Sequence, residues 1–260
     1  MDDTYQIYVN RVAPLTLPAT YQSQLPHIQA SPKFQQGKAI AFPGYSIITP
    51  PGNEDAQNDN FYRGLIEVQA RLVSAFGNFL IPLPPESFHL TIADLIWESQ
   101  YKAAIAENLQ FETQLKDCIR DSFQQYKPSW LENNCIQWQI LGLLVFPRAL
   151  AVALVPKQEA DYLPILQLRR SLYQNPELIA LGIEQQYHYT AHITLGYFDE
   201  IPADLDRDCC TQTLCQLNDH WLEMEPQVLK ISEIQLRRFT DMTHFHREAD
   251  YPTLNFSDTL

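Results

Sequence analysis

Two short segments of the chain share one form, in which a histidine and a threonine alternate with apolar residues. Residues 88–92 read Phe-His-Leu-Thr-Ile, and residues 191–195 read Ala-His-Ile-Thr-Leu. Successive side chains of a β-strand point to opposite faces, so the alternation predicts a buried apolar face in each segment. The histidine and the threonine then share the other face, about 6.6 Å apart along the strand.

Two imidazoles and two hydroxyls suit the cleavage of a phosphodiester. One of His89 and His192 would take a proton from water or from an adjacent ribose hydroxyl, and the other would give a proton to the leaving oxygen. Imidazole has a pKa of about 6.5 and serves either role near neutral pH. Thr91 and Thr194 would donate hydrogen bonds to the phosphate oxygens as these gain charge. This scheme uses no metal ion and no cofactor.

The elements that carry the two motifs follow the same order in both halves of the chain. Each half has an apolar strand, then apolar residues at helical spacing, then a strand that holds the motif. The predicted strands are 39–49, 88–96, 149–157 and 188–198, and the helical spacing covers 65–76 and 165–172. Such an architectural repeat predicts two lobes whose polar faces converge on one groove.

Further elements are predicted outside the repeat. Helical spacing recurs at 111–122 and 214–221, and a strand at 135–146 joins strand 149–157 through a tight Pro-Arg turn. Residues 228–239 and 242–249 are predicted to form a final pair of strands. Residues 1–37 carry four prolines among many glutamines and serines, so we expect an extension wrapped loosely on the surface. Residues 38–260 are expected to form the functional domain, with lobes built around strands 88–96 and 188–198.

At the two His-apolar-Thr motifs the sequence resembles the two-histidine phosphoesterase superfamily, which includes cyclic nucleotide phosphodiesterases and RNA 2′,3′-cyclic phosphodiesterases. The resemblance implies an α+β, bilobal and pseudo-symmetric fold of two antiparallel sheets facing a central groove, with helices on the outside. It also implies catalytic roles for His89 and His192 and phosphate-binding roles for Thr91 and Thr194. The substrate would be a cyclic nucleotide or another small phosphodiester, including an RNA end.

The second motif can be read in two registers, because His188 and Thr190 alternate onto the same face as His192 and Thr194. We prefer His192, because Ile193 and Leu195 keep the apolar alternation around it. His188 is then a substrate contact or a histidine at the strand end.

Aromatic and basic residues near the predicted groove are further candidates for substrate binding. Tyr45, Trp97 and Tyr197 lie near the motif strands and could stack on a nucleobase. Arg148 and Lys157 flank the strand that opens the second repeat and could contact a phosphate. Core packing of the aromatic residues and solvent exposure of the cations are the ordinary alternatives.

Composition sets the class of partner and the expected compartment. The chain has 260 residues, 45% of them hydrophobic, and a net charge of −13, which disfavours binding to long nucleic acids. Five cysteines without CxxC spacing predict neither a disulfide framework nor a zinc site, so a reducing cytoplasm is expected. We also expect no signal peptide and no membrane span, because the chain lacks a long apolar run.

Two alternatives remain open at this stage. One is a binding module for a nucleotide or phosphate that does not turn over its ligand, although such a module would more naturally use Arg or Lys. The other is a metallohydrolase centred on His244 and His246, which share a strand face and would need Asp241, Glu248 or His220 to complete a site.

Overall fold

The computed structural model describes residues 3–126 and 135–256. Its helices are α1 (Tyr5–Val12), α2 (Pro18–Gln24), α3 (Asp59–Phe76), α4 (Glu98–Glu107), α5 (Phe111–Gln125), α6 (Glu159–Tyr173), α7 (Pro176–Ala180) and α8 (Arg207–Glu223). Its strands are β1 (Phe34–Gln35), β2 (Lys38–Ala39), β3 (Gly44–Ile48), β4 (Leu80–Pro82), β5 (Thr91–Trp97), β6 (Ile136–Phe146), β7 (Ala149–Pro156), β8 (His192–Phe198), β9 (Val228–Ile231), β10 (Glu233–Asp241), β11 (His244–His246) and β12 (Thr253–Asn255).

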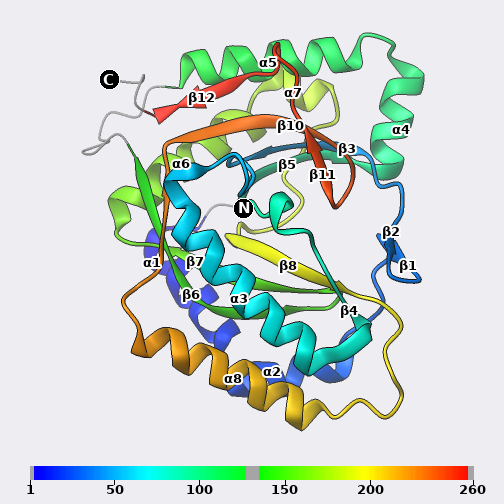
Figure 1. Ribbon diagram of the computed structural model, residues 1–260. Helices are drawn as coiled ribbons and strands as arrows, with labels where there is room; N and C mark the ends of the chain where they lie inside the picture. Colours follow the sequence, from blue (N-terminus) through cyan, green and yellow to red (C-terminus); the bar gives the residue numbers. More distant parts are fainter. Residues whose placement is uncertain (1–2, 127–134, 257–260) are drawn as a thin grey trace.

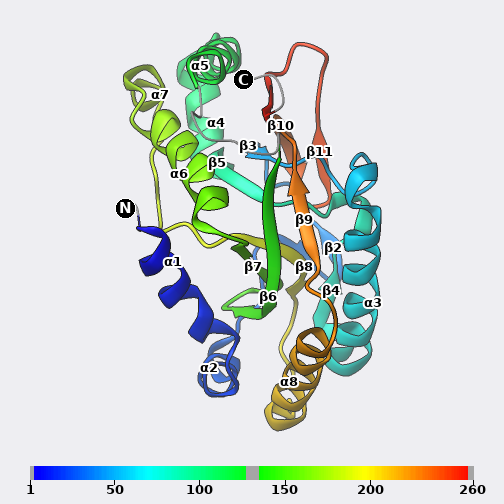
Figure 2. The same cartoon turned by 90° about the vertical axis from the view of Figure 1, so that its left-hand side faces the viewer.

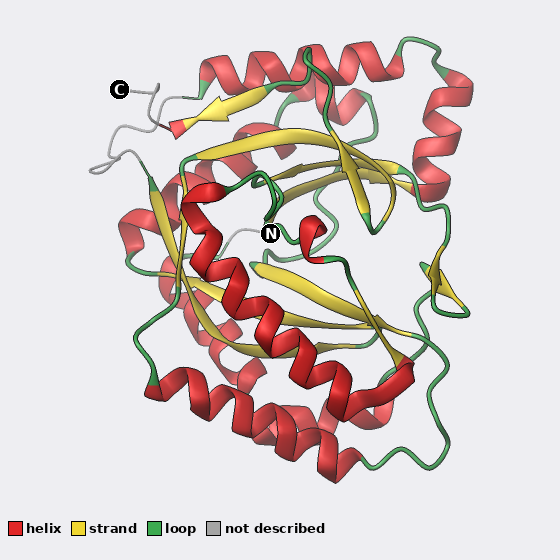
Figure 3. Cartoon of the chain, viewed as in Figure 1, coloured by secondary structure: helices red, strands yellow, loops and turns green. Residues whose placement is uncertain are grey.

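Two antiparallel sheets form the framework (Figure 1). The first has the strand order β11-β10-β3-β5, with β12 also paired to β10, and the second has the order β4-β8-β7-β6-β9. Helices α4 and α5 lie outside the first sheet, and α2 and α8 lie outside the second (Figure 3). The predicted α+β fold of two antiparallel sheets with outer helices is therefore confirmed.

The repeat predicted from the motifs is visible in the strand pairing. Strand β3 pairs with β5 in the first sheet, and β7 pairs with β8 in the second, each pair antiparallel. The helix of the first repeat crosses to the other sheet, since α3 packs against β4, β8 and α8. The buried amide of Gln69 on α3 donates hydrogen bonds to the carbonyls of Leu83 and Leu195, both at 2.7 Å. These contacts bind the two halves together at the second motif strand.

Local sequence accounts for most of these elements. Helix α3 buries Leu65, Val68 and Leu72 along one side, and it ends at Gly77, whose φ of 68° lies in the region that glycine adopts without strain. Strand β7 is buried along its whole length, as expected for an apolar strand inside a sheet covered on both sides. No helix among the described residues is both long and apolar enough to cross a membrane.

Three predicted elements differ in the structure. Strands β5 and β8 begin at Thr91 and His192, later than the predicted starts at 88 and 188. The predicted pairing of 228–239 with 242–249 is confirmed by the antiparallel pair of β10 and β11, but the first of these strands is divided, because β9 joins β6 in the second sheet while β10 also pairs with β3 in the first. Ser232 separates β9 from β10, so the chain passes from one sheet to the other there.

The N-terminal residues are packed into the core, so the prediction of a loosely wrapped extension is wrong. Helices α1 and α2 and the turn after them place Tyr8, Val12, Tyr21 and Leu25 at 0% exposure. Helix α1 packs against α6 and β7, and Figure 2 shows it beside α6 along one side of the molecule. Proline-rich composition misled the prediction, because Pro18 stands in the first turn of α2, where proline is well tolerated.

The free edge of β5 is joined to the second repeat by side chains instead of by another strand. Three of its carbonyls accept hydrogen bonds: Ile92 from Arg169, Asp94 from Tyr173 at 2.7 Å, and Thr91 from Tyr189 at 3.4 Å. This arrangement satisfies the edge carbonyls and fixes the first motif strand against α6 and against Tyr189, which precedes the second motif.

Candidate active site

A pocket of about 580 Å³ lies where the two motif strands approach each other. His89 and Thr91 line it from the first repeat, and His192 and Thr194 line it from the second. Neither threonine hydroxyl bonds to another group within the part of the chain that the structure describes. The pocket therefore holds two imidazoles and two hydroxyls that are free to meet a ligand.

The alternation predicted from the sequence explains why these four side chains face one space. The intervening apolar residues are buried at 1% exposure or less, and they are Phe88, Leu90, Ile92, Ala191, Ile193 and Leu195. Their burial against the core turns the histidines and threonines to the opposite faces of their segments. The histidine and threonine faces of the two segments line the same pocket.

Both imidazoles are held by the same contact. Nδ1 of His89 lies 2.7 Å from the carbonyl oxygen of Ser87, and Nδ1 of His192 lies 2.7 Å from that of Thr190. A carbonyl oxygen only accepts, so Nδ1 is the protonated nitrogen in each ring. Nε2 is then the atom of each ring that can accept a proton when neutral and donate one when charged.

An aromatic ring packs edge-on against each imidazole. Phe245 lies against His89 with ring centroids 4.2 Å apart, and Phe146 lies against His192 at 4.8 Å. The buried Arg237 donates a hydrogen bond to the carbonyl of Phe245 at 3.1 Å and pairs with Glu54, which fixes the first of these contacts. The aromatic rings restrict the orientation of both imidazoles, which stay partly exposed in the pocket.

Burial is the largest influence on both histidine pKa values. The pKa of His89 falls to about 4, mainly through burial and in smaller part through the charges of His192 and Arg237. Burial also lowers the pKa of His192, but the nearby carboxylate of Asp94 raises it and Lys33 lowers it. In both rings the bond to the carbonyl opposes the effect of burial. Nearby charge thus favours a neutral His89, whereas a carboxylate supports the protonated form of His192.

Two cations line the pocket, and the sequence reasoning named only one of them. Arg148 was a candidate, whereas Lys33 lies in residues 1–37, which were assigned no role. The ammonium of Lys33 lies 4.7 Å from the ring centre of Phe42 and 5.2 Å from that of Tyr197. Within the described residues neither cation has a carboxylate partner. In a chain with a net charge of −13, two unpaired cations in one pocket favour an anionic ligand.

Two aromatic candidates line the pocket. Tyr197 packs against Phe34 with ring centroids 5.2 Å apart and also lies under Lys33, so its ring supports the cation. Trp97, at the end of β5, lines the pocket and is partly exposed.

Ser46 and Asp94, which the sequence reasoning missed, also line the pocket and are joined by a hydrogen bond of 3.0 Å. Ser46 is a polar residue between apolar neighbours on β3, a signal that could have identified it, whereas a register shift in β5 brings Asp94 to the pocket and strict alternation from Thr91 would not have placed it there.

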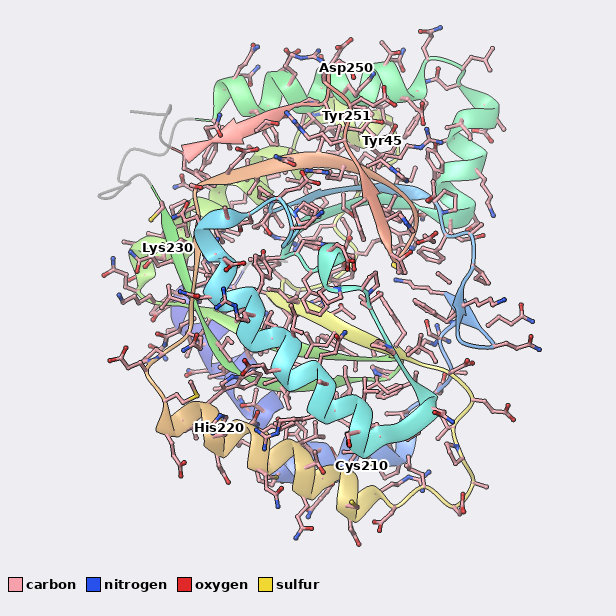
Figure 4. All side chains as sticks on the ribbon, viewed as in Figure 1. Tyr45, Cys210, His220, Lys230, Asp250 and Tyr251 are labelled. Atoms are coloured by element: carbon pink, nitrogen blue, oxygen red, sulfur yellow. The ribbon has the colours of Figure 1, made fainter. Side chains whose placement is uncertain are left out.

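Tyr45 does not reach the pocket, so its prediction as a substrate contact is wrong. It is 1% exposed, and its hydroxyl lies 3.3 Å from that of Tyr251. Figure 4 shows both tyrosines on the outer, helix-covered side of the first sheet. Its neighbour Ser46 faces the pocket instead, because successive residues of β3 point to opposite sides.

His188 does not line the pocket, and of the two roles predicted for it the contact with substrate stays a prediction. Its side chain is 51% exposed, and its Nδ1 lies 3.2 Å from a carboxylate oxygen of Asp3. The strand predicted to carry it begins only at His192, so the alternation does not extend back to it. Lys157, another candidate cation, is bonded to Gln137 at 3.2 Å and does not line the pocket.

His244 and His246 lie on β11 beside a second pocket of about 470 Å³. Their rings are stacked with centroids 6.1 Å apart, and Asp241 lies 3.5 Å from His244. His220 is on α8, on the far side of the molecule (Figure 4). No group of three or more His, Cys, Asp or Glu residues that could hold a metal ion occurs in residues 3–126 and 135–256.

Comparisons with known proteins agree with this geometry. The family model described as 2H-phosphodiest, a domain of unknown function (DUF1868), matches residues 33–141, which include the first motif. A conserved protein of unknown function from Agrobacterium tumefaciens has a similar fold, with a TM-score of 0.62, 16% identity, and coverage of 91% of this chain and 97% of that one. No curated protein matches the sequence.

Two other solved structures show weaker similarity. The protein TT0787 of Thermus thermophilus has a TM-score of 0.46 at 12% identity, covering 82% of this chain and 97% of its own. E. coli LigT complexed with 3′-AMP has a TM-score of 0.40 at 14% identity, covering 82% and 96%. The family match over residues 33–141 confirms the resemblance to the two-histidine phosphoesterase superfamily that the motifs predicted.

Proposed function

We propose that this chain, which has the fold and the paired motifs of the two-histidine phosphoesterase superfamily, hydrolyses a cyclic phosphate or another small phosphodiester. The match to the family model described as 2H-phosphodiest supports a phosphoesterase of this superfamily. The finer proposal rests on one observation: two imidazoles line one pocket, and a carbonyl oxygen holds Nδ1 of each ring. No metal ion takes part in the steps we propose.

The charges around the two rings suggest which one acts as the base. His89, neutral at physiological pH, takes a proton from the attacking water through Nε2 as the new bond to phosphorus forms. His192, supported by the carboxylate of Asp94, gives its Nε2 proton to the leaving oxygen as the old bond breaks. The products are a phosphate monoester and a free hydroxyl, and solvent restores the two protonation states.

The remaining lining groups hold the phosphate. The hydroxyls of Thr91 and Thr194 donate to the non-bridging oxygens, where negative charge grows in the transition state. Lys33 and Arg148 add positive charge at the same pocket, with Lys33 held over two aromatic rings. Trp97 offers a ring on which a nucleobase could stack. A small nucleotide or an RNA end fits this set better than a long nucleic acid does.

Turnover against a substrate panel tests the proposal. The panel holds 2′,3′-cyclic nucleotides, linear dinucleotides and short RNAs ending in a cyclic phosphate, each assayed with and without EDTA. Hydrolysis of at least one class by the wild-type chain, unchanged by EDTA and lost in His89→Gln and His192→Gln, is the expected result. Binding without turnover would favour the nucleotide-binding alternative, and activity restored only by added zinc or manganese would favour a metallohydrolase.

A further inference from the structure

Helix α1 contacts the chain immediately before His192. Three polar groups of residues 3–11 bond to residues 188–191, namely the Asp3 carboxylate, the Tyr8 hydroxyl and the Arg11 guanidinium. The family model begins at residue 33, so this helix lies outside the matched region. The packing of α1 onto the second motif is therefore a feature of this chain that the family match does not describe.

The Tyr8 hydroxyl interrupts the pairing of β7 and β8. It donates to the carbonyl of Leu154 at 2.9 Å and accepts from the amide of Ala191 at 3.1 Å. The amide of Leu154 still bonds directly to the carbonyl of Ala191 at 2.9 Å. The hydroxyl thus stands between the Ala191 amide and the Leu154 carbonyl, where a direct hydrogen bond would otherwise complete the antiparallel pair of these two residues. It stands next to His192, the first residue of β8.

Arg11 holds Tyr189 and Thr190, which lie before the start of β8. Its Nη1 donates to the hydroxyl of Thr190 at 2.9 Å, and its Nη2 donates to the carbonyl of Tyr189 at 2.5 Å. Its Nε bonds to Asp3 at 2.8 Å, which orients the guanidinium. The planar fork of arginine allows these three bonds together, whereas lysine has one ammonium to share.

These contacts act on the atom that holds the imidazole. The carbonyl of Thr190 accepts the bond from Nδ1 of His192, and Thr190 lies between Tyr189, held by Arg11, and Ala191, held by Tyr8. We propose that Tyr8 and Arg11 are positioning residues for His192. The inference rests on the proposed function for its effect on rate, while its structural part does not depend on turnover.

Tyr21 provides a matched control. It lies in α2, is fully buried like Tyr8, and its hydroxyl also donates to a strand carbonyl, that of Leu143, at 2.7 Å. The hydroxyl also accepts a bond from Asn218 at 2.6 Å, and neither partner belongs to the segment 188–195 that carries the second motif. Tyr8→Phe and Tyr21→Phe each remove one buried hydroxyl, so an effect on His192 in the first variant alone cannot come from general loss of stability.

The structural readout is the Nδ1 proton of each histidine, observed by NMR in uniformly ¹⁵N-labelled protein and assigned with His89→Gln and His192→Gln. Tyr8→Phe and Arg11→Gln should shift or broaden the His192 signal and leave the His89 signal in place. Tyr21→Phe should leave both unchanged. Arg11→Lys should behave like Arg11→Gln, because it keeps the charge near Asp3 but not the fork. An unchanged His192 signal in both Tyr8→Phe and Arg11→Gln would overturn the inference.

The kinetic readout separates this inference from the proposed function. Tyr8→Phe should lower kcat about 10- to 100-fold, the cost of a small displacement of a reacting group, while KM stays near the wild-type value. Equal losses in Tyr8→Phe and Tyr21→Phe would also contradict positioning. If the wild-type chain hydrolyses none of the diesters but the His192 signal responds as expected, the proposed function fails and the positioning role stands.

Discussion

His89 and His192 are held in equivalent ways, each with Nδ1 2.7 Å from the carbonyl two residues before it. His89 lies two residues before β5 of the first sheet, His192 begins β8 of the second, and both rings line one pocket. Equivalent anchors give both rings the same tautomer, so their different roles must come from their surroundings. His192 has Asp94 nearby, while His89 is close to the positive charges of Arg237 and, when protonated, His192.

We predict that kcat/KM against pH is bell-shaped with a maximum on the acid side of neutral. The base must be neutral, so activity falls as the pH drops through the His89 pKa of about 4. The acid must be protonated, so activity also falls as the pH rises through the His192 pKa, which burial lowers from 6.5. The rate should therefore decline steadily as the pH rises above neutral. A maximum on the alkaline side of neutral would contradict the protonation states assigned here.

The two possible assignments of acid and base give the same bell shape, so the leaving group must separate them. A p-nitrophenyl phosphodiester has a leaving group that needs no proton. We predict that His192→Gln recovers most of its lost rate on this substrate, relative to an alkyl diester, because the acid is no longer needed. His89→Gln should remain impaired on both substrates. Recovery in His89→Gln instead would reverse the two roles.

Thr91→Val and Thr194→Val are nearly isosteric changes that remove one hydroxyl each. We predict losses of roughly 10- to 1,000-fold in kcat, as for other donors aimed at charge that grows in the transition state. The thermal unfolding midpoint should change little, because neither hydroxyl bonds to another described residue. Wild-type kinetics in both variants would show that the threonines do not contact the phosphate.

Lys33→Met should weaken the use of a phosphodiester by removing a cation from the pocket while keeping most of the side-chain volume. The expected loss is about 10- to 100-fold in kcat/KM, the worth of a hydrogen bond to a charged group. Lys38→Met, on the nearby strand β2 but outside the pocket lining, is the matched control and should keep wild-type kinetics. Equal kinetics in the two variants would remove Lys33 from the site.

The sequence predicted the parts of this fold that depend on local periodicity. Alternation of apolar residues placed His89 and His192 on the correct faces, and helical spacing identified α3 before Gly77. Element order then predicted two lobes. These features are visible in sequence because burial of one face of a strand or helix imposes a period on the residues.

The failures arose where distant residues decide the local structure. His188 shares the alternation of His192, but the Tyr8 hydroxyl interrupts the strand pairing between them, and nothing near residue 190 indicates this. Tyr45 lies on the strand that lines the pocket, but on the wrong face of β3. The sequence did not identify Lys33, because the residues around it show no periodicity. Its contacts with Phe42 and Tyr197 place its ammonium at the pocket.

The most direct test of the account is the turnover of His89→Ala, His192→Ala, the double variant and His188→Ala on the best diester substrate. Each catalytic variant should lose on the order of 100- to 10,000-fold in kcat, the usual worth of a positioned acid or base. The double variant should lose much less than the product of these losses, because the two residues act as one unit. His188→Ala should keep wild-type rates. Near-normal turnover in either His89→Ala or His192→Ala, or loss of activity in His188→Ala alone, would contradict the two-histidine site.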